Sequence, residues 1–296
     1  MKSTQSGERL KVGIALASLY ILWSSTYLAI RIAIESIPPF MMAGLRFFIT
    51  GWALYLFLRL RGVGAPEKRQ WLAGAAVGAL LLPVGNGGVV YAEQWVASSL
   101  AALGVATVPL WTVLFGCLWK RRPTWIEWAG VLLGLAGVVL LNFEGDLRAH
   151  PIGALALVIA TIGWSFGSAW GKELPLPKGL MNGAVQMISG GALFFVMSVL
   201  WGEPMPDAVS SRSLIALIYL MIFGALIGFS AYTYLINNVR ASLATSYAYV
   251  NPVFAVLLGV AAAGERISAA GVAAMLVIVG AVMLVLLGGP SMKQSD

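Results

Sequence analysis

The chain has 296 residues, of which 59% are hydrophobic and only 10% are charged. Soluble domains carry about 25% charged residues, so this composition excludes an ordinary soluble protein and indicates an integral membrane protein. The formal net charge of +7 does not indicate a nucleic-acid-binding protein, because the basic residues gather in short segments between apolar stretches.

Ten apolar stretches approach the roughly 20 residues that an α-helix needs to cross a bilayer. The connecting segments are too short to fold as soluble domains. The sequence therefore predicts an all-α integral membrane protein whose function lies within the bilayer. In chain order, the predicted spans are approximately Gly13–Ile34, Phe40–Leu60, Trp71–Ala92, Ser98–Trp119, Trp125–Leu141, Ile152–Gly171, Leu180–Trp201, Ser213–Ile236, Ser242–Ala263 and Ala270–Leu287.

The loops of the first half differ strongly in charge. Basic residues cluster within residues 2–11, 59–69 and 120–122, which all fall on one side of the membrane if the ten spans alternate in direction. The positive-inside rule assigns that side to the cytoplasm. The bias is weaker in the second half. We therefore predict that both termini are cytoplasmic.

The two halves carry the same motif. Residues 99–116 and 242–259 both contain Ser-Leu-Ala, then Pro, Val-Leu and Gly at identical spacing, with an offset of 143 residues. Trp23-Ser24 likewise recurs as Trp164-Ser165. We predict two five-helix repeats, residues 1–145 and 146–296. Because five is an odd number of spans, the repeats are expected to have inverted orientations, as in many transporters.

The polar residues offer little for catalysis. The three aspartates and the single histidine, His150, lie in loops or in the tail, so no aspartyl pair or metal site can be assembled. The segment Gly167–Lys172 lacks the spacing of a phosphate-binding loop. We expect no catalytic residue, no metal and no cofactor.

Aromatic and small polar residues in repeat-related positions predict a substrate cavity. Trp23 and Trp164 match between the halves, and Tyr27 shares a helical face with Trp23. An aromatic-lined cavity without strong fixed charge suits small zwitterions with an apolar side chain. The predicted lining residues are Trp23, Tyr27, Asn86, Trp111, Trp164, Ser165, Ser168, Tyr234, Thr245, Tyr249 and Asn251.

Prolines and charges mark candidate gates. Pro109 and Pro252 remove backbone hydrogen bonds within spans and are predicted to bend two gate helices. Arg31 and Lys172 are repeat-related and would lie at opposite mouths, where each could meet a substrate carboxylate. Glu93 is a candidate coupling carboxylate, because no span carries a carboxylate at mid-depth.

Each of these assignments has a structural alternative. The polar and aromatic residues could equally pack the core or form interhelical hydrogen bonds. Arg31 and Lys172 could be ordinary basic helix ends. Arg46 is interpreted as snorkelling to the interface or forming a structural pair, and Glu93 as a solvated interfacial residue.

Several segments resemble the ten-helix, EamA-type families of the drug/metabolite transporter superfamily. They are WSSTYLAIR (Trp23–Arg31), PPFMMAGLRF (Pro38–Phe47), Ser99–Gly116, Ser246–Gly259 and the Gly264-Glu265 pair. The resemblance covers nearly the whole chain. Within the family, the chain is similar to bacterial inner-membrane exporters of amino acids, including aromatic ones, and of other metabolites. It implies two five-helix halves around a central cavity, alternating access, and peripheral fifth and tenth helices.

We therefore expect a bacterial inner-membrane exporter of small metabolites, above all amino acids including aromatic ones. Its expected partners are a small-molecule substrate and the lipid bilayer, with no nucleic acid, and its expected state is a monomer or a homodimer. Two alternatives remain open from the sequence. One is a multidrug efflux carrier, and the other is a non-transporting membrane scaffold or sensor.

Overall fold

The structure is a computed structural model that describes residues 2–95, 98–119, 123–142, 151–254 and 269–287. Every regular element within these ranges is helical, which confirms the all-α prediction. In this part of the chain, six helices are long and apolar enough to cross a membrane. They are Gly7–Ala33, Pro39–Leu60, Lys68–Ala92, Pro151–Glu173, Leu180–Leu200 and Ser211–Asn238.

The remaining predicted spans are only partly matched. Shorter apolar helical segments occur at Val108–Leu118, Trp125–Gly137 and Val272–Ala281. The second part of the predicted span Ser242–Ala263, the Gly264-Glu265 pair and the predicted boundary between residues 145 and 146 lie outside the described residues.

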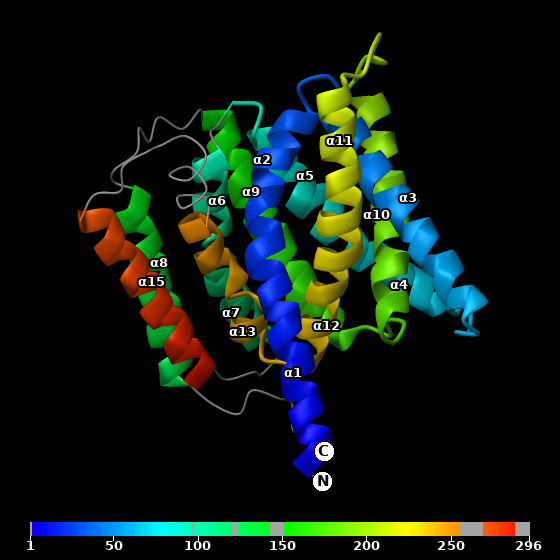
Figure 1. Cartoon of the computed structure of the whole chain (residues 1–296). Coiled ribbons are helices and arrows are strands. Elements are labelled where there is room, and N and C mark those ends of the chain that lie inside the picture. Colours follow the sequence, from blue (N-terminus) through cyan, green and yellow to red (C-terminus); the bar gives the residue numbers. More distant parts are fainter. Residues whose placement is uncertain (1, 96–97, 120–122, 143–150, 255–268, 288–296) are drawn as a thin grey trace.

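The first half consists of helices that cross the bundle in alternating directions (Figure 1). Two of them contain a wider π-helical turn, η1 and η2. The elements are α1 (Lys2–Ser18), η1 (Leu19–Trp23), α2 (Ser24–Ala33), α3 (Pro39–Leu60), α4 (Lys68–Ala79), η2 (Leu80–Asn86), α5 (Gly87–Ala92), α6 (Ser98–Val105), α7 (Val108–Leu118) and α8 (Trp125–Asn142).

The second half follows the same plan. Its elements are α9 (Pro151–Trp170), the short 3-10 turn η3 (Gly171–Glu173), α10 (Leu180–Leu200), α11 (Ser211–Tyr219), the π-helical η4 (Leu220–Phe229), α12 (Ser230–Asn238), α13 (Ala241–Ala244), a helical stretch over residues 247–254, and α15 (Ala269–Leu287).

Figure 1 shows where the helices lie. α8 and α15 pack against each other at one edge of the bundle, and α3 and α10 pack together at the opposite edge. The start of α1 and the end of α15 lie at the same end of the bundle. The peripheral position of α8 and α15 is the one that the family resemblance implies for the fifth and tenth helices.

Glycines allow α3 and α10 to cross at close range. A Cβ atom built on Gly51 of α3 would lie 2.7 Å from the backbone nitrogen of Ile188, and one built on Gly191 of α10 would lie 2.5 Å from that of Phe48. Real Cβ atoms do not approach backbone so closely, so only glycine fits at either position. Close approach at small residues is how helices gain contact where water does not drive association.

Three π-helical turns interrupt the long helices near mid-bundle. In η2 the cause is local: Pro83 has no N–H group, and its ring clashes with the carbonyl four residues before it. A π-helical turn frees carbonyl groups for other partners. One of these carbonyls, that of Gly224 in η4, accepts a hydrogen bond of 3.1 Å from Trp23 Nε1.

The two predicted gate prolines differ in their surroundings. Pro109 is the second residue of α7, and the chain turns at residues 106–107 just before it. The predicted span Ser98–Trp119 is thus interrupted beside Pro109, and a proline in the first turn of α7 costs no helical hydrogen bond. The role of Pro109 in a gate stays a prediction. Pro252 lies within the helical residues 247–254, after a turn at residues 245–246.

The carboxylate of Glu203 caps α3 from a distant segment. Its two oxygens accept hydrogen bonds of 2.8 Å and 2.9 Å from the backbone N–H groups of Phe40 and Met41. We expect Glu203→Gln to lower the free energy of unfolding by about 1 kcal/mol, because the amide is neutral and accepts fewer of these bonds. The measurement is the apparent melting temperature in detergent. Asp207→Asn, an exposed charge change in the same loop, is the control, and equal shifts would contradict the capping role.

Candidate functional site

A central cavity lies in the middle of the bundle, between elements of both halves of the chain. It encloses about 60 Å³. Ligand pockets usually measure about 300–1,000 Å³, so this cavity has room for a few waters and helices must separate before a metabolite can enter. Aromatic and aliphatic side chains form most of its wall. The polar or aromatic residues that line it are Trp23, Thr26, Tyr27, Arg46, Phe47, Asn86, Thr161, Trp164, Phe229 and Tyr247.

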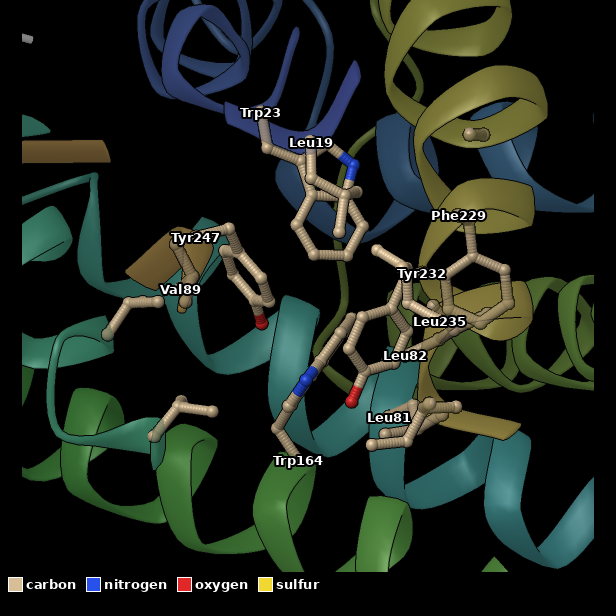
Figure 2. Close-up of a cluster of buried hydrophobic side chains, with 14 of the residues drawn as sticks. Leu19, Trp23, Leu81, Leu82, Val89, Trp164, Phe229, Tyr232, Leu235 and Tyr247 are labelled. Atoms are coloured by element: carbon tan, nitrogen blue, oxygen red, sulfur yellow. The ribbon is translucent and has the colours of Figure 1, made fainter. Parts of the chain in front are cut away.

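Four aromatic rings from four segments converge beside the cavity (Figure 2). The ring centres of Trp23 and Trp164 are 5.6 Å apart at an interplanar angle of 79°, and those of Trp23 and Tyr247 are 4.7 Å apart at 89°. Tyr232 lies 5.0 Å from Trp164. Edge-to-face contacts of this kind are favourable for aromatic quadrupoles, so the rings form a defined wall.

Each tryptophan lies on a glycine of a π-helical turn. A Cβ atom on Gly85 of η2 would lie 2.9 Å from Cε3 of Trp164, and a Cβ atom on Gly228 of η4 would collide with Nε1 of Trp23. Trp23 belongs to the first half and Gly228 to the second, whereas Trp164 and Gly85 have the opposite origin. The indoles therefore connect the two halves at the cavity.

Arg46 of α3 is a buried cation in the cavity wall. Its residue is 2% exposed, and its Nε and Nη1 atoms have no hydrogen-bond partner among the described residues. Its Cζ atom lies 4.6 Å from the centre of the Phe47 ring. The interpretation that Arg46 snorkels to the interface is therefore wrong, whereas a structural pair with Glu93, which lies within electrostatic reach, stays the alternative.

Glu93, directly after α5, is also buried. It is 4% exposed, and neither carboxylate oxygen has a hydrogen-bond partner in the described part of the chain. Arg31 and Arg46 are the charges within electrostatic reach of this carboxylate. The interpretation of Glu93 as a solvated interfacial residue is thus wrong, whereas its proposed coupling role stays a prediction.

The structure places four of the predicted lining residues at the cavity. They are Trp23, Tyr27, Asn86 and Trp164. Arg46 and Tyr247 also line it, although the sequence analysis assigned no substrate contact to them. The signal for Tyr247 was available, since it lies between the predicted lining residues Thr245 and Tyr249.

Two predicted serines lie beside the cavity but bond to protein atoms. Ser165 donates a hydrogen bond of 3.1 Å to the carbonyl of Val108. Ser168 donates a bond of 2.6 Å to the carbonyl of Trp164 and shares one of 2.5 Å with the hydroxyl of Tyr232. In this conformation the two hydroxyls join helices, which is the structural alternative.

The predicted residues of segment 245–251 also face other helices. Tyr249 donates a hydrogen bond of 3.1 Å to the carbonyl of Val131 on α8. The side-chain oxygen of Asn251 accepts a bond of 3.0 Å from Ser24. Thr245 bonds to the carbonyl of Ala241, one turn before it. These contacts hold the segment against α8 and α2 and keep these groups out of the cavity wall.

Trp111 and Tyr234 also lie away from the cavity wall. Trp111 stacks on Phe115 of its own helix, with ring centres 6.3 Å apart. Tyr234 is half-buried and packs against the edge of the core. Sequence spacing shows which residues share a face of a helix, but not whether that face meets the cavity or another helix. The positions of these two side chains could therefore not be predicted.

A second space, the end cavity, opens where α7 and α9 end and where α8 and α13 begin. It encloses about 350 Å³ and is lined by Lys172, Glu127, Arg240 and Ser242. The Nη1 atom of Arg240 lies 3.1 Å from Oε1 of Glu127, and Ser242 donates a hydrogen bond of 2.6 Å to the same oxygen. Arg31 lies at the opposite end of the bundle, at the exposed end of α2.

Nothing in the sequence pairs Glu127 with Arg240. Thr124 and Glu127 carry a capping-box spacing, and the structure shows the box: the N–H of Thr124 lies 2.9 Å from Oε2 of Glu127, and the N–H of Glu127 lies 3.2 Å from Oγ1 of Thr124. The pattern indicates a helix start, but it does not reveal the long-range partner, Arg240.

Comparison with known proteins identifies relatives over most of the chain. The EamA-like transporter family matches residues 11–143 and again residues 151–287. The "Uncharacterized inner membrane transporter YedA" of Escherichia coli (strain K12) is 48% identical over 275 residues, which cover 93% of this chain and 90% of that protein. The "Uncharacterized transporter YoaV" of Bacillus subtilis (strain 168) is 23% identical over 259 residues, covering 84% and 87%.

A solved structure shares the fold. It is described as "Crystal structure of protein", and it matches with a TM-score of 0.74 and 25% sequence identity over 93% of this chain and 97% of its own. The sequence motifs, the apolar helical bundle and the two matched halves agree with one another. The chain belongs to the EamA-like transporter family, within the drug/metabolite transporter superfamily.

Proposed function

We propose that the chain is a ten-helix bacterial inner-membrane transporter that exports small metabolites, in particular amino acids including aromatic ones, by alternating access. The observation that carries the proposal is the aromatic-lined central cavity between elements of both halves. Family membership supports transport, and the cavity wall supports a substrate with an apolar ring or side chain.

Reciprocal contacts support two inverted repeats, residues 1–145 and 146–296. Gly191 follows Gly51 by 140 residues, and Ile188 follows Phe48 by the same 140. The contact of Gly51 with Ile188 and that of Gly191 with Phe48 are therefore exchanged by one two-fold operation. Such an axis in the membrane plane is what inverted-topology repeats produce.

The same operation relates the tryptophan contacts. Gly228 follows Gly85 by 143 residues, and Trp164 follows Trp23 by 141. Trp23 lies on Gly228, and Trp164 lies on Gly85. Each half thus supplies one indole ring and the glycine on which the other half's indole packs. This arrangement suits a site between two halves that move relative to each other during transport.

Contacts at the two ends of the bundle supply candidate gates. At the end where α1 begins, which we assign to the cytoplasm, Glu127 joins α8 to Arg240 and Ser242. On the side of the other end, the hydroxyls of Ser25 and Tyr219 lie 2.6 Å apart, about two helical turns inward from where α2 ends and α11 begins. We propose that one set of contacts opens while the other holds.

The direct test is uptake of radiolabelled amino acids into liposomes that contain the purified protein, with and without an imposed pH gradient. Saturable uptake supports transport, and stimulation by the gradient supports coupling through Glu93. A chain that moves no amino acid in this assay would contradict the proposed substrate class.

Trp164→Ala is expected to reduce uptake of aromatic amino acids about tenfold per folded molecule, because an aromatic contact contributes about 1.5 kcal/mol beyond its area. The measurement is the initial uptake rate divided by the amount of monodisperse protein. Trp170→Ala, which removes a half-buried indole from the end of the same helix, is the matched control. Equal losses of rate in both variants would mean that Trp164 only packs the core.

The cavity wall argues against the multidrug alternative. A carboxylate in the wall would favour a lipophilic cation, whereas the charged residue that lines the central cavity is Arg46, and the buried carboxylate of Glu93 lies outside that wall. The scaffold alternative predicts that changes in the wall leave the protein's function intact, and the uptake assay decides it.

A further inference from the structure

The most unusual group in the bundle is the guanidinium of Arg46. It is a cation in the wall of the central cavity, 2% exposed, with Nε and Nη1 lacking hydrogen-bond partners among the described residues. A buried charge without a partner is costly, and ionisable residues within membrane proteins commonly mark substrate pathways. The buried carboxylate of Glu93 lies within electrostatic reach but accepts no hydrogen bond from Arg46, so these donors point to a ligand as their partner.

We propose that Arg46 binds the carboxylate of the transported substrate. This inference rests on the proposed transport function and specifies its substrate class: small organic carboxylates with an apolar part, α-amino acids among them. A guanidinium presents its N–H groups in a planar fork that matches the two oxygens of a carboxylate. The volume of about 60 Å³ accommodates such a head group, whereas the rest of the substrate requires opening.

The surroundings hold the guanidinium at the cavity. A Cβ atom on Gly224 would lie 2.5 Å from Nη2 of Arg46, so the absence of a side chain there leaves room for the guanidinium against η4. The Phe47 ring supports it from another side, with Cζ 4.6 Å from the ring centre. Neither contact uses the donors on Nε and Nη1, which stay available for a ligand.

The same cavity offers an acceptor for an ammonium group. The side-chain oxygen of Asn86, on η2, is buried and has no hydrogen-bond partner in the described part of the chain. One cationic donor, one neutral acceptor and the rings of Trp164 and Tyr247 complement a carboxylate, an ammonium and an apolar side chain. This set favours aromatic α-amino acids within the wider class of carboxylates.

A structural role for Arg46 makes a different prediction. Glu93 lies within electrostatic reach, so Arg46 could serve only to balance its charge. In that case Arg46→Gln would destabilise the protein by leaving Glu93 uncompensated, and Glu93→Gln in the same chain would restore stability. If Arg46 is a substrate ligand, Arg46→Gln leaves the melting temperature unchanged or raises it, because a costly unpaired charge is removed.

The test uses the full-length protein in liposomes and in detergent, with L-phenylalanine and L-phenylalaninamide as probes. The amide keeps the ring and the ammonium but lacks the carboxylate. We expect unlabelled phenylalanine to inhibit the uptake of radiolabelled amino acid by the wild-type protein, and the amide to inhibit this uptake much less. Arg46→Gln is expected to lose at least about thirtyfold in affinity for phenylalanine, the usual range for a charge-assisted bidentate contact. It is also expected to lose the discrimination between the two probes.

Arg46→Lys is the second variant, since it keeps the charge but not the fork, and we expect it to restore part of the affinity. Uptake by Arg46→Gln with unchanged affinity and discrimination would overturn the inference, as would a loss of uptake that only follows a lower melting temperature. If the wild-type protein transports amides and amines but no carboxylate, the proposed transport function is supported and the proposed role of Arg46 is contradicted. If it is neither stabilised by nor carries any carboxylate, amide or amine, both proposals fall.

Discussion

Replacing Gly191 by alanine is expected to remove most of the folded protein. The new Cβ atom would lie 2.5 Å from the backbone nitrogen of Phe48 and 2.7 Å from its Cα atom. Backbone atoms in a helix cannot move aside singly, so α3 and α10 would have to separate along their shared contact. We expect a cost of about 3 kcal/mol, at the upper end of overpacking effects in a well-packed core.

The measurement is the yield of monodisperse protein in gel filtration together with its apparent melting temperature. Gly280→Ala is the control, because a Cβ atom at Gly280 of α15 meets nothing within 4 Å. It is expected to be neutral or slightly stabilising, since alanine favours the helix over glycine. If Gly191→Ala were as stable as the control, the close crossing of α3 and α10 would not contribute to stability.

Much of the fold follows from the sequence because membranes impose simple rules. Every backbone polar group in hydrocarbon must bond within the chain, so an apolar run long enough to cross the bilayer becomes a helix. The long spans of α3 and α10 needed no other information. Features that depend on neighbours did not follow: Thr107 lies in a turn between α6 and α7, although the apolar pattern continues through it.

The site was partly predictable for a different reason. Trp23 and Trp164 are identified by their recurrence between the halves, because a duplicated fold repeats its contacts. The position in the second half that corresponds to Arg46 is Gln186 of α10, which is not basic. Recurrence between the halves therefore did not identify Arg46 as a site residue. Its importance becomes visible only from its burial and from its unused donors, which are properties of the packed bundle.

Glu127→Gln is expected to destabilise the protein and to open the end cavity. The carboxylate of Glu127 accepts a hydrogen bond from Ser242, pairs with Arg240 at 3.1 Å and caps the start of α8. The two charged side chains are only 10% and 19% exposed, so solvent compensates the loss poorly. Removing one partner of such a pair costs about 3 kcal/mol. The change is expected to lower the melting temperature and loosen α8 from α13.

The control is a carboxylate that makes a similar pair in water. Glu35 lies 3.7 Å from Nη2 of Arg212, but these side chains are 46% and 67% exposed. Glu35→Gln is therefore expected to change stability by at most about 0.5 kcal/mol. The opening is measured separately, as the rate at which a membrane-impermeant thiol reagent labels Val113→Cys in a Cys117→Ser background, since Val113 lines the end cavity. Faster labelling in Glu127→Gln would identify the Glu127–Arg240 pair as a gate contact, because opening a gate must increase access to the cavity. Destabilisation with unchanged labelling would identify the pair as a helix cap only, because losing a cap need not change access.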